Sequence, residues 1–478
     1  MNSTKGIISK GVFYTALSRY SNVLITILIT AILARLLTPF EFGVVAVVMV
    51  FTTFFNVLGD FGIGPAVIQF KNLTEKDLQS IFSFSVIVSI ALASIFFLSN
   101  HLVASFYEDE KLKDIIKLLS ISVLFFSMSV VPKALLFKKL KFKQVGILNV
   151  AIQLCSGTVA IILAYFEYSY FSLIVKSILD GLLSFIIFFS LSFVKPTLRI
   201  KWISIEKIIG FSSYQFMFNF INYFSRNTDN LLISKYFGPA LLGYYDKAYR
   251  LMMMPVQNLT HVITPTLQPI LSEFQDDHDK IFVSYLKVVK VLALIGFPLS
   301  FFLFYSSTEI VYIIFGSQWD ASVPIFKLLA LTVGLQMVLS SSGAIFQSID
   351  RTDLLFVSGL ISSFFMVSGI CYGIFLGRSL EHVGLGLIFA FGLNFIQSFY
   401  FLIVRGLKKP LIKFFKILMV PIGTSCILGL VLCFVSYYRR DNMFLNLLIN
   451  LIVFLILFLI SQEHRKIFSD LIRDFKKG

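Results

Sequence analysis

The sequence is poor in charge and in cysteine. Charged side chains make up 14% of the 478 residues, whereas hydrophobic ones make up 57%, and the mean hydropathy is +0.86. This balance lies far from that of soluble proteins. The four cysteines show no CxxC spacing, which argues against a disulfide framework and against a cysteine metal site. Long polar stretches are scarce too, so little of the chain is left for a soluble domain.

Motifs of soluble enzymes are also missing from the sequence. It contains no GxxxxGKS/T, no GxSxG and no HExxH. This argues against a P-loop ATPase, a nucleophile-elbow hydrolase and a zinc protease. The five histidines lie far apart and lack the spacing of metal ligands. We therefore expect no catalytic residue, no bound metal and no cofactor.

What the chain does contain is fourteen apolar stretches of membrane-spanning length. A helix that crosses the hydrocarbon core needs about 20 mostly apolar residues, because its backbone must satisfy its own hydrogen bonds there. We therefore expect an all-α polytopic membrane protein with about fourteen transmembrane helices. The expected spans are 13–37, 42–68, 80–100, 115–136, 145–165, 169–194, 207–236, 240–270, 282–307, 322–348, 354–376, 383–404, 412–437 and 443–460.

Lysine and arginine gather in alternate gaps between these spans. With the N-terminus in the cytoplasm, 25 of them lie in or beside the inner gaps and seven in or beside the outer ones. Such an asymmetry is the positive-inside pattern of membrane proteins. It predicts that both termini are cytoplasmic. It also accounts for the net charge of +15 without a nucleic-acid partner.

The chain contains an internal duplication at an offset of 200 residues, where AILARLLTPFEFGVV aligns with LLISKYFGPALLGYY. Six spans separate the copies, so both cross the membrane in the same direction. We expect two parallel six-helix lobes, an N-lobe at 1–200 and a C-lobe at 201–406, followed by a C-terminal helix pair and tail at 407–478. Convergence of two hairpins on one turn chemistry is the alternative. The matched pairs are Asn22 with Asn222, Arg35 with Lys235, Pro39 with Pro239, Gly43 with Gly243, and Pro65 with Pro265.

Ionisable residues inside the expected spans are concentrated rather than scattered. Each costs roughly 3 kcal/mol on insertion scales, so each calls for an interior partner or a watery cavity. Lys176 and Asp180 lie four apart on one helical face and are expected to form a structural charge pair. Arg35 and Lys235 lie near outer helix ends, where snorkelling explains them. The candidates for a cavity lining are Arg226, Arg250, Lys247, Arg19, Asp229, Asp60, Asn222 and Asn230.

The arginines admit two interpretations. In the first, Arg226 and Arg250 line a hydrated central cavity, where their planar guanidinium groups would bind an anionic substrate such as a phosphate. In the second, Arg226–Asp229 and Asp246–Arg250 are closed pairs within single helices. The stretch YFSRNTDNLLI, the most polar inside any span, favours the first interpretation. Arg19 also has a simpler explanation, since it could mark the cytoplasmic boundary of the first span.

Several segments carry a family resemblance: LARLLTPFEFGVVAVV, DFGIGPAVIQ, YFSRNTDNLLI, GYYDKAYRLMMMPVQNLT and PTLQPILSEFQDD. They resemble the polysaccharide-exporter branch of the multidrug/oligosaccharidyl-lipid/polysaccharide flippase superfamily, and within it the colanic-acid and teichuronic-acid exporter type. The resemblance covers essentially the whole chain. It implies alternating access and a substrate that is an oligosaccharide repeat unit on undecaprenyl pyrophosphate, flipped from the cytoplasmic to the outer leaflet.

The resemblance also implies a multi-pass protein of the bacterial inner membrane, whose partners are lipids, the lipid-linked glycan, glycosyltransferases and a polymerase. The driving force stays open between a proton, a sodium ion and consumption of the product. A multidrug or organic-ion exporter is the first alternative, although it would prefer an acidic, aromatic cavity. An integral-membrane glycan polymerase or ligase is the second, although the longest outer gap, Asn100–Asp114, is short for one.

Overall fold

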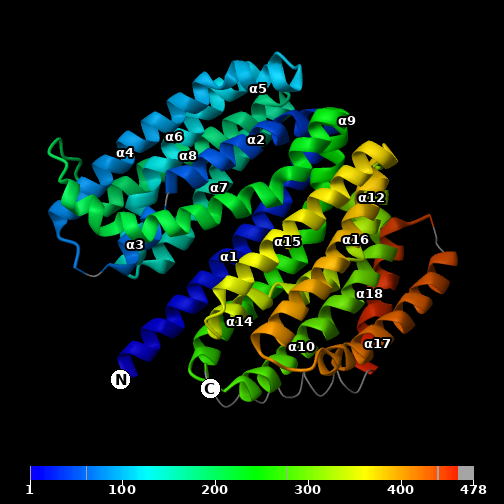
Figure 1. The fold of residues 1–478 in the computed structure, drawn as a ribbon. Helices are drawn as coiled ribbons and strands as arrows, with labels where there is room; N and C mark the ends of the chain where they lie inside the picture. The colour runs from blue at the N-terminus through cyan, green and yellow to red at the C-terminus, as the bar shows by residue number, and fades with distance from the viewer. Residues whose placement is uncertain (1, 61, 71, 276, 439–440, 461–478) are drawn as a thin grey trace. The chain divides into compact units, whose positions relative to one another are not determined.

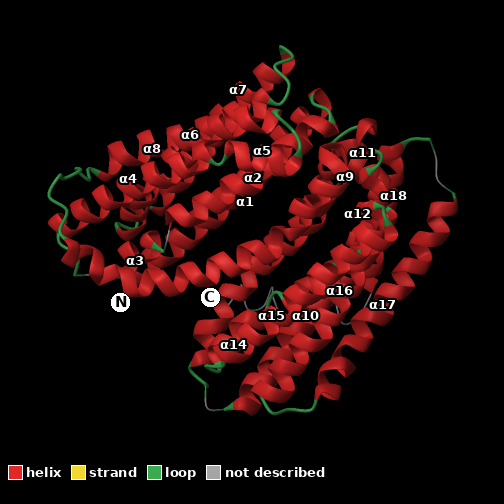
Figure 2. Ribbon diagram, turned by 45° about the horizontal axis from the view of Figure 1, so that its top comes forward, coloured by secondary structure: helices red, strands yellow, loops and turns green. Residues whose placement is uncertain are grey.

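Every regular element in the described part of the chain is helical, and no strand occurs there (Figure 2). This confirms the expected all-α fold, in which the backbone of each helix satisfies its own hydrogen bonds. The computed structural model describes residues 2–60, 62–70, 72–275, 277–438 and 441–460, with side chains for all of these except 2–16, 204, 207–222, 224–226, 261–266, 268–270 and 460.

Residues Met1–Gly243 form a first compact unit. Within it α6 packs against α8, α4 and α2, and α1 packs against α7. Small residues permit the closest approach, since the Ser122 hydroxyl of α6 donates to the Ser177 carbonyl of α8 at 2.8 Å. The helices are α1 Asn2–Leu36, α2 Pro39–Asp60, α3 Ile63–Gln69, α4 Glu75–Leu98, α5 Asn100–Tyr107, α6 Lys111–Lys138, α7 Phe142–Tyr165 and α8 Phe171–Ser192 (Figure 1).

Local chemistry sets the turn between α1 and α2. Thr38 precedes α2, and its hydroxyl accepts the Glu41 N–H at 3.3 Å while the Glu41 carboxylate accepts the Thr38 N–H at 2.6 Å. These reciprocal bonds form a capping box. Pro39 opens the helix, where its missing N–H costs nothing. The expected spans 13–37 and 42–68 thus correspond to separate helices, α1 ending at Leu36 and α2 beginning at Pro39.

The long helix α9, Trp202–Ser272, is broken at Gly238, whose φ of 84° and ψ of 171° are not helical. Glycine tolerates this positive φ, and the following Pro239 disfavours a helical conformation at the residue before it. The break separates the expected spans 207–236 and 240–270. The first compact unit extends to Gly243, whereas the sequence predicts a lobe boundary at 200/201.

Residues Tyr244–Gly478 form the second compact unit. Within it α10 packs against α17 and α13, and α15 packs against α16. Its elements after α9 are α10 His278–Tyr305, α11 Ser307–Ile314, η1 Ser317–Trp319, α12 Ser322–Ala330, α13 Val333–Leu339, α14 Ser342–Ser348, α15 Thr352–Cys371, η2 Tyr372–Gly377, α16 Leu380–Phe399, η3 Tyr400–Gly406, α17 Leu411–Tyr437 and α18 Met443–Ile460.

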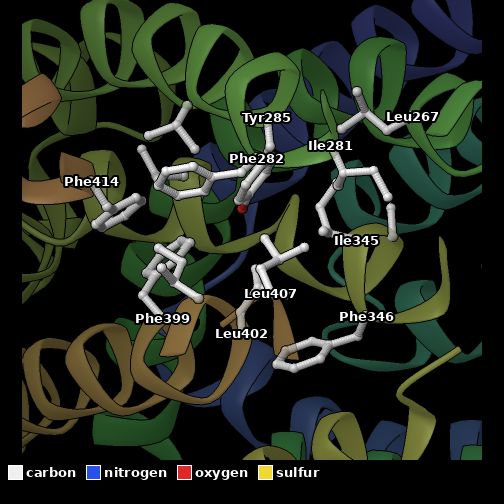
Figure 3. Packing of buried hydrophobic residues seen from close by; sticks show 14 of the residues in the cluster. Leu267, Ile281, Phe282, Tyr285, Ile345, Phe346, Phe399, Leu402, Leu407 and Phe414 are labelled. Atoms are coloured by element: carbon white, nitrogen blue, oxygen red, sulfur yellow. The ribbon is translucent and has the colours of Figure 1, made fainter. Parts of the chain in front are cut away.

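A cluster of buried side chains holds the second unit together (Figure 3). The Phe399 and Phe414 rings stack with centroids 4.2 Å apart, which joins α16 to α17. Tyr285 of α10 is fully buried, and its hydroxyl hydrogen-bonds to the Ser341 hydroxyl at 3.0 Å. In a membrane such a cluster acts through close packing and satisfied polar groups rather than by excluding water.

The expected span 322–348 is not one continuous helix. Its two parts, Ser322–Ala330 and Val333–Ser348, are bent by 49°. Gly334 lies in the second part, and a Cβ added there would lie 3.0 Å from the Phe297 Cα of α10. The expected span 322–348 thus corresponds to a bent helix pair, and hydropathy alone does not reveal the bend.

Ten helices of the described residues are long and apolar enough to cross a membrane, and up to eleven if the bent pair forms one span. These do not include the two parts of α9, and the apolar part of α18, Met443–Leu459, is shorter. Each of the fourteen expected stretches falls on helical segments. The count of fourteen spans and the cytoplasmic location of both termini stay predictions.

Candidate functional site

Two of the candidate residues, Lys247 and Arg250, lie together with Asp246 on α9, just after its break. The Arg250 Nε donates to both carboxylate oxygens of Asp246, at 2.9 and 2.8 Å, because residues four apart share one helical face. The Asp246 side chain is 12% exposed, whereas that of Arg250 is 67% exposed. Within the described part of the chain, Arg250 makes no other hydrogen bond. The Arg250 side chain is thus paired through Nε and otherwise largely exposed.

Lys247 lies between these two residues in sequence but is buried. Its Nζ lies 5.8 Å from the centroid of the Trp319 ring, a cation–π contact. Trp319 also meets the Tyr244 ring edge-on, with centroids 5.9 Å apart, and the Ser322 hydroxyl donates to the Tyr244 carbonyl at 2.9 Å. These contacts fix the start of the second part of α9 against η1 and α12. Arg250 is thus far more accessible than Lys247.

Trp319 was not among the residues expected from the sequence to form a site. The chain has only two tryptophans, and Trp319 is one of them. A tryptophan that is fully buried beside a lysine is a specific packing arrangement. Rarity is a signal that could have directed attention to it, although its partner Lys247 lies 72 positions earlier in the chain.

The polar stretch of α9 before its break is described only in part. Asp229 is buried, and one of its carboxylate oxygens accepts the Asn230 N–H at 2.8 Å. Asn227 donates from its side-chain amide to the Tyr223 carbonyl at 2.9 Å. The side chains of Arg226 and Asn222 lie outside the described residues. The interpretations of Arg226 and Asn222 therefore stay predictions.

The other two cavity candidates of the first unit lie on separate elements. Arg19 is exposed on α1. Asp60 ends α2 and is half-buried, and its carboxylate accepts the Gly64 N–H at 3.2 Å. This bond falls in the first turn of α3, where free N–H groups favour an acidic partner. Asp60 thus has a local role in starting α3, in addition to the cavity role expected from the sequence.

Lys176 and Asp180 of α8 form an ion pair of 2.7 Å, as their spacing predicts. The second carboxylate oxygen of Asp180 accepts a hydrogen bond from the Ser156 hydroxyl of α7. The pair therefore joins two helices as well as neutralising itself. Its surroundings resemble those of a packing contact, since polar side chains between membrane helices commonly hydrogen-bond across them.

The chemistry available at Arg250 is that of a fixed cation. A guanidinium stays charged at any working pH and matches the oxygen geometry of a phosphate or carboxylate. Asp246 holds the guanidinium at Nε, which orients the terminal nitrogens. In the described ranges, no group of three or more histidine, cysteine, aspartate or glutamate residues could hold a metal ion.

Comparison with solved structures shows the fold. The chain is similar to a lipid II flippase, MurJ, in an inward closed conformation, with a TM-score of 0.72 at 16% identity over 97% of this chain and 99% of that one. It is also similar to an inward-facing multidrug-resistance transporter of the MATE family and MOP superfamily. That match has a TM-score of 0.63 at 14% identity over 81% and 97% of the two chains.

Comparison of sequences shows the family. The lipopolysaccharide biosynthesis protein WzxC of Escherichia coli (strain K12) is 25% identical over 398 residues, 82% of this chain and 80% of that protein. The teichuronic acid biosynthesis protein TuaB of Bacillus subtilis (strain 168) is 25% identical over 442 residues, 91% and 89% of the two chains. The model of one family, described as polysaccharide biosynthesis protein, matches residues 32–324. The resemblance seen in the sequence is confirmed, and the chain belongs to the polysaccharide biosynthesis protein family.

Proposed function

We propose that this protein flips an undecaprenyl-pyrophosphate-linked oligosaccharide repeat unit from the cytoplasmic to the outer leaflet of the bacterial inner membrane. The observation that carries the proposal is the family match over residues 32–324. The names of the relatives support it, because they refer to biosynthesis of lipopolysaccharide and teichuronic acid and to transport in succinoglycan biosynthesis. The protein is a multi-pass membrane transporter and not an enzyme. Alternating access would move the substrate.

Arg250 is the described residue best suited to hold the pyrophosphate. Its side chain is more than half exposed, although the chain as a whole is largely apolar. An exposed arginine in lipid would be costly, so a hydrated surface suits this position better. Its bond to Asp246 neutralises part of the charge, and Lys247 beside it leaves the segment cationic. Arg226, on the earlier part of α9, is proposed as its companion.

The multidrug exporter is the alternative that shares the fold. The two functions differ in the charge of the substrate, since an organic cation needs acidic partners and a pyrophosphate needs basic ones. The exposed Arg250 favours the anionic substrate. Under this proposal glycosyltransferases build the substrate on the inner leaflet and a polymerase consumes it on the outer one, and no cofactor takes part.

Removal of the protein tests the proposal. A strain that lacks it and any paralogue should keep the lipid-linked repeat unit on the cytoplasmic leaflet and lose its surface polysaccharide. The repeat unit can be located by its susceptibility to a glycosidase added to right-side-out and inside-out vesicles. Normal surface polysaccharide in that strain would contradict the proposal. Hypersensitivity to cationic drugs, with normal polysaccharide, would favour the multidrug exporter.

A further inference from the structure

The duplicated segments contain a Pro-x-x-x-Gly turn, at Pro39–Gly43 in the first copy and at Pro239–Gly243 in the second. The two turns lie directly against each other in the first compact unit. A Cβ added to Gly43 would lie 1.7 Å from the Pro239 carbonyl oxygen. A Cβ added to Gly243 would lie 2.1 Å from the Pro39 carbonyl oxygen. The glycine of each copy therefore faces the proline of the other. Only glycine permits this, because any larger residue would collide with backbone.

The contact is symmetric in its finer detail too. The added Cβ of Gly43 would lie 3.1 Å from the Gly243 nitrogen, and that of Gly243 would lie 3.3 Å from the Gly43 nitrogen. The two turns thus meet backbone to backbone, as small residues allow in membrane helices. A contact without interdigitated side chains can separate and re-form without any rotamer change.

Other side chains join α9 to the end of α5, a third segment. Lys235 of α9 donates from its Nζ to the Glu108 carboxylate at 2.8 Å and lies 5.3 Å from the Phe106 ring centroid. The Tyr107 hydroxyl donates to the Leu231 carbonyl of α9 at 3.3 Å. Lys235 was expected only to snorkel, and that expectation was incomplete because its partner is 127 residues away.

The expected topology places all three participating segments on one side. The turn at Pro39, the gap Asn100–Asp114 and the turn at Pro239 are each outer in the positive-inside pattern. The Glu108 side chain is 81% exposed, so its ion pair with Lys235 is open to water. Exposed ion pairs are weak and readily reversible. The arrangement therefore combines a close backbone contact between the two turns with a weak ion pair between Lys235 and Glu108.

We propose that these residues form an outer gate of the transporter, closed in this structure, which must part for substrate to leave on the outer side. The gate consists of Pro39, Gly43, Glu108, Lys235, Pro239 and Gly243. The inference rests on the proposed function only in treating the protein as a transporter. The duplication supplies the two halves of the gate, since each copy contributes one glycine and one proline.

Accessibility of a buried reporter tests the gate without any substrate. Ser234 is adjacent to Lys235 and 5% exposed, and within the described structure its hydroxyl has no partner. The Ser234→Cys variant, with the four native cysteines replaced by alanine, would be labelled in intact cells by a membrane-impermeant maleimide. Gly43→Ala and Gly243→Ala, each added to it, should raise the labelling rate by roughly tenfold, because they prevent closure.

Two further sets of variants keep the test decisive. Gly423→Ala is the matched control, since a Cβ there would meet nothing within 4 Å, and it should leave labelling unchanged. Lys235→Glu alone should raise labelling, and its combination with Glu108→Lys should bring it back. These charge variants address the gate even if the alanine variants fail to fold. Unchanged labelling in the folded glycine and charge variants would overturn the proposal.

A cross-link tests whether opening is required. A short bis-maleimide that joins the two cysteines of Glu108→Cys with Lys235→Cys should stop transport, whereas each single variant should keep transporting after treatment. Continued transport by the cross-linked protein would overturn the gate. The labelling experiment needs no substrate. If the transported molecule is not the proposed glycan, the labelling results still test the gate, so failure of one proposal can be distinguished from failure of the other.

Discussion

At the scale of single residues, Asp246 and Arg250 differ in a way that bears on function. The carboxylate is buried and the guanidinium is exposed, although the two are bonded. An exposed guanidinium would be costly in lipid, so its exposure fits a hydrated surface. On such a surface the cation can contact a ligand while it stays bonded to Asp246.

Replacement of Arg250 should therefore separate these roles. Arg250→Ala should abolish export at an unchanged protein level, and Arg250→Lys should give an intermediate rate, because lysine keeps the charge but loses the fork. Complementation of surface polysaccharide in the deletion strain measures this. Arg351→Ala is the matched control and should export normally, since Arg351 also pairs with an aspartate, Asp353, but at a chain turn.

A double variant addresses the structural interpretation of Arg250. If Arg250 only neutralises Asp246, then Asp246→Asn combined with Arg250→Gln should export normally. We expect export to stay lost while the protein remains folded.

The same design applies to Arg226 with Asp229, where Arg226→Ala is expected to abolish export. Recovery in either double variant would assign that arginine a structural role.

Glu108 provides a prediction about pH. Its ion pair with Lys235 lowers the pKa of the Glu108 carboxyl below its usual value. A lowered folded-state pKa means that the stabilisation is present above the unfolded pKa, about 4.3, and is lost as pH falls through the folded pKa. In purified protein, the difference in melting temperature between wild type and Glu108→Gln should thus persist near neutral pH and vanish in acid. A difference that is constant with pH would contradict the pairing.

At the scale of elements, hydropathy locates helices well but does not reveal how they are joined. The ion pair on α8 also binds α7 through Ser156, and the break in α9 falls where glycine precedes proline. The first connection depends on residues 24 apart in sequence, whereas the second is local. Local features of this kind are therefore the ones that sequence can predict.

The pair on α8 should show the cost of an uncompensated charge in the membrane. Lys176→Met leaves the Asp180 carboxylate without its cation and should lower the free energy of unfolding by roughly 3 kcal/mol. The combination Lys176→Met with Asp180→Leu should recover most of this loss, since both charges are then gone. Thermal denaturation in detergent measures both. Equal destabilisation by the single and double changes would contradict this account.

At the scale of the whole molecule, the proposed gate and site both depend on the topology, which is the side of the membrane that each loop faces. Cysteine labelling in intact cells can establish it in the cysteine-free background. Glu110→Cys should react with an impermeant maleimide, because the gap before α6 is expected outside. Lys139→Cys, at the end of α6, should react only after permeabilisation. The reverse pattern would invert the topology and move the proposed gate to the inner side.

The amino-acid sequence was sufficient to predict the fold class, the apolar helical segments, the breaks at Pro39 and Pro239, and the family. Each of these depends on composition, on backbone restrictions of proline and glycine, or on similarity along the chain, which are all readable locally. The duplication was also readable, as a repeat of Pro-x-x-x-Gly at a fixed offset.

The contacts that those residues make became visible only in the folded molecule. Asp60 starts α3, Lys247 is buried against Trp319, Lys235 pairs with Glu108, and Gly43 faces Pro239. Apart from the bond of Asp60, these contacts join residues 72 to 196 positions apart. Their formation depends on how packed helices bring distant faces together, and the periodicity of one segment carries no information about which other segment lies against it.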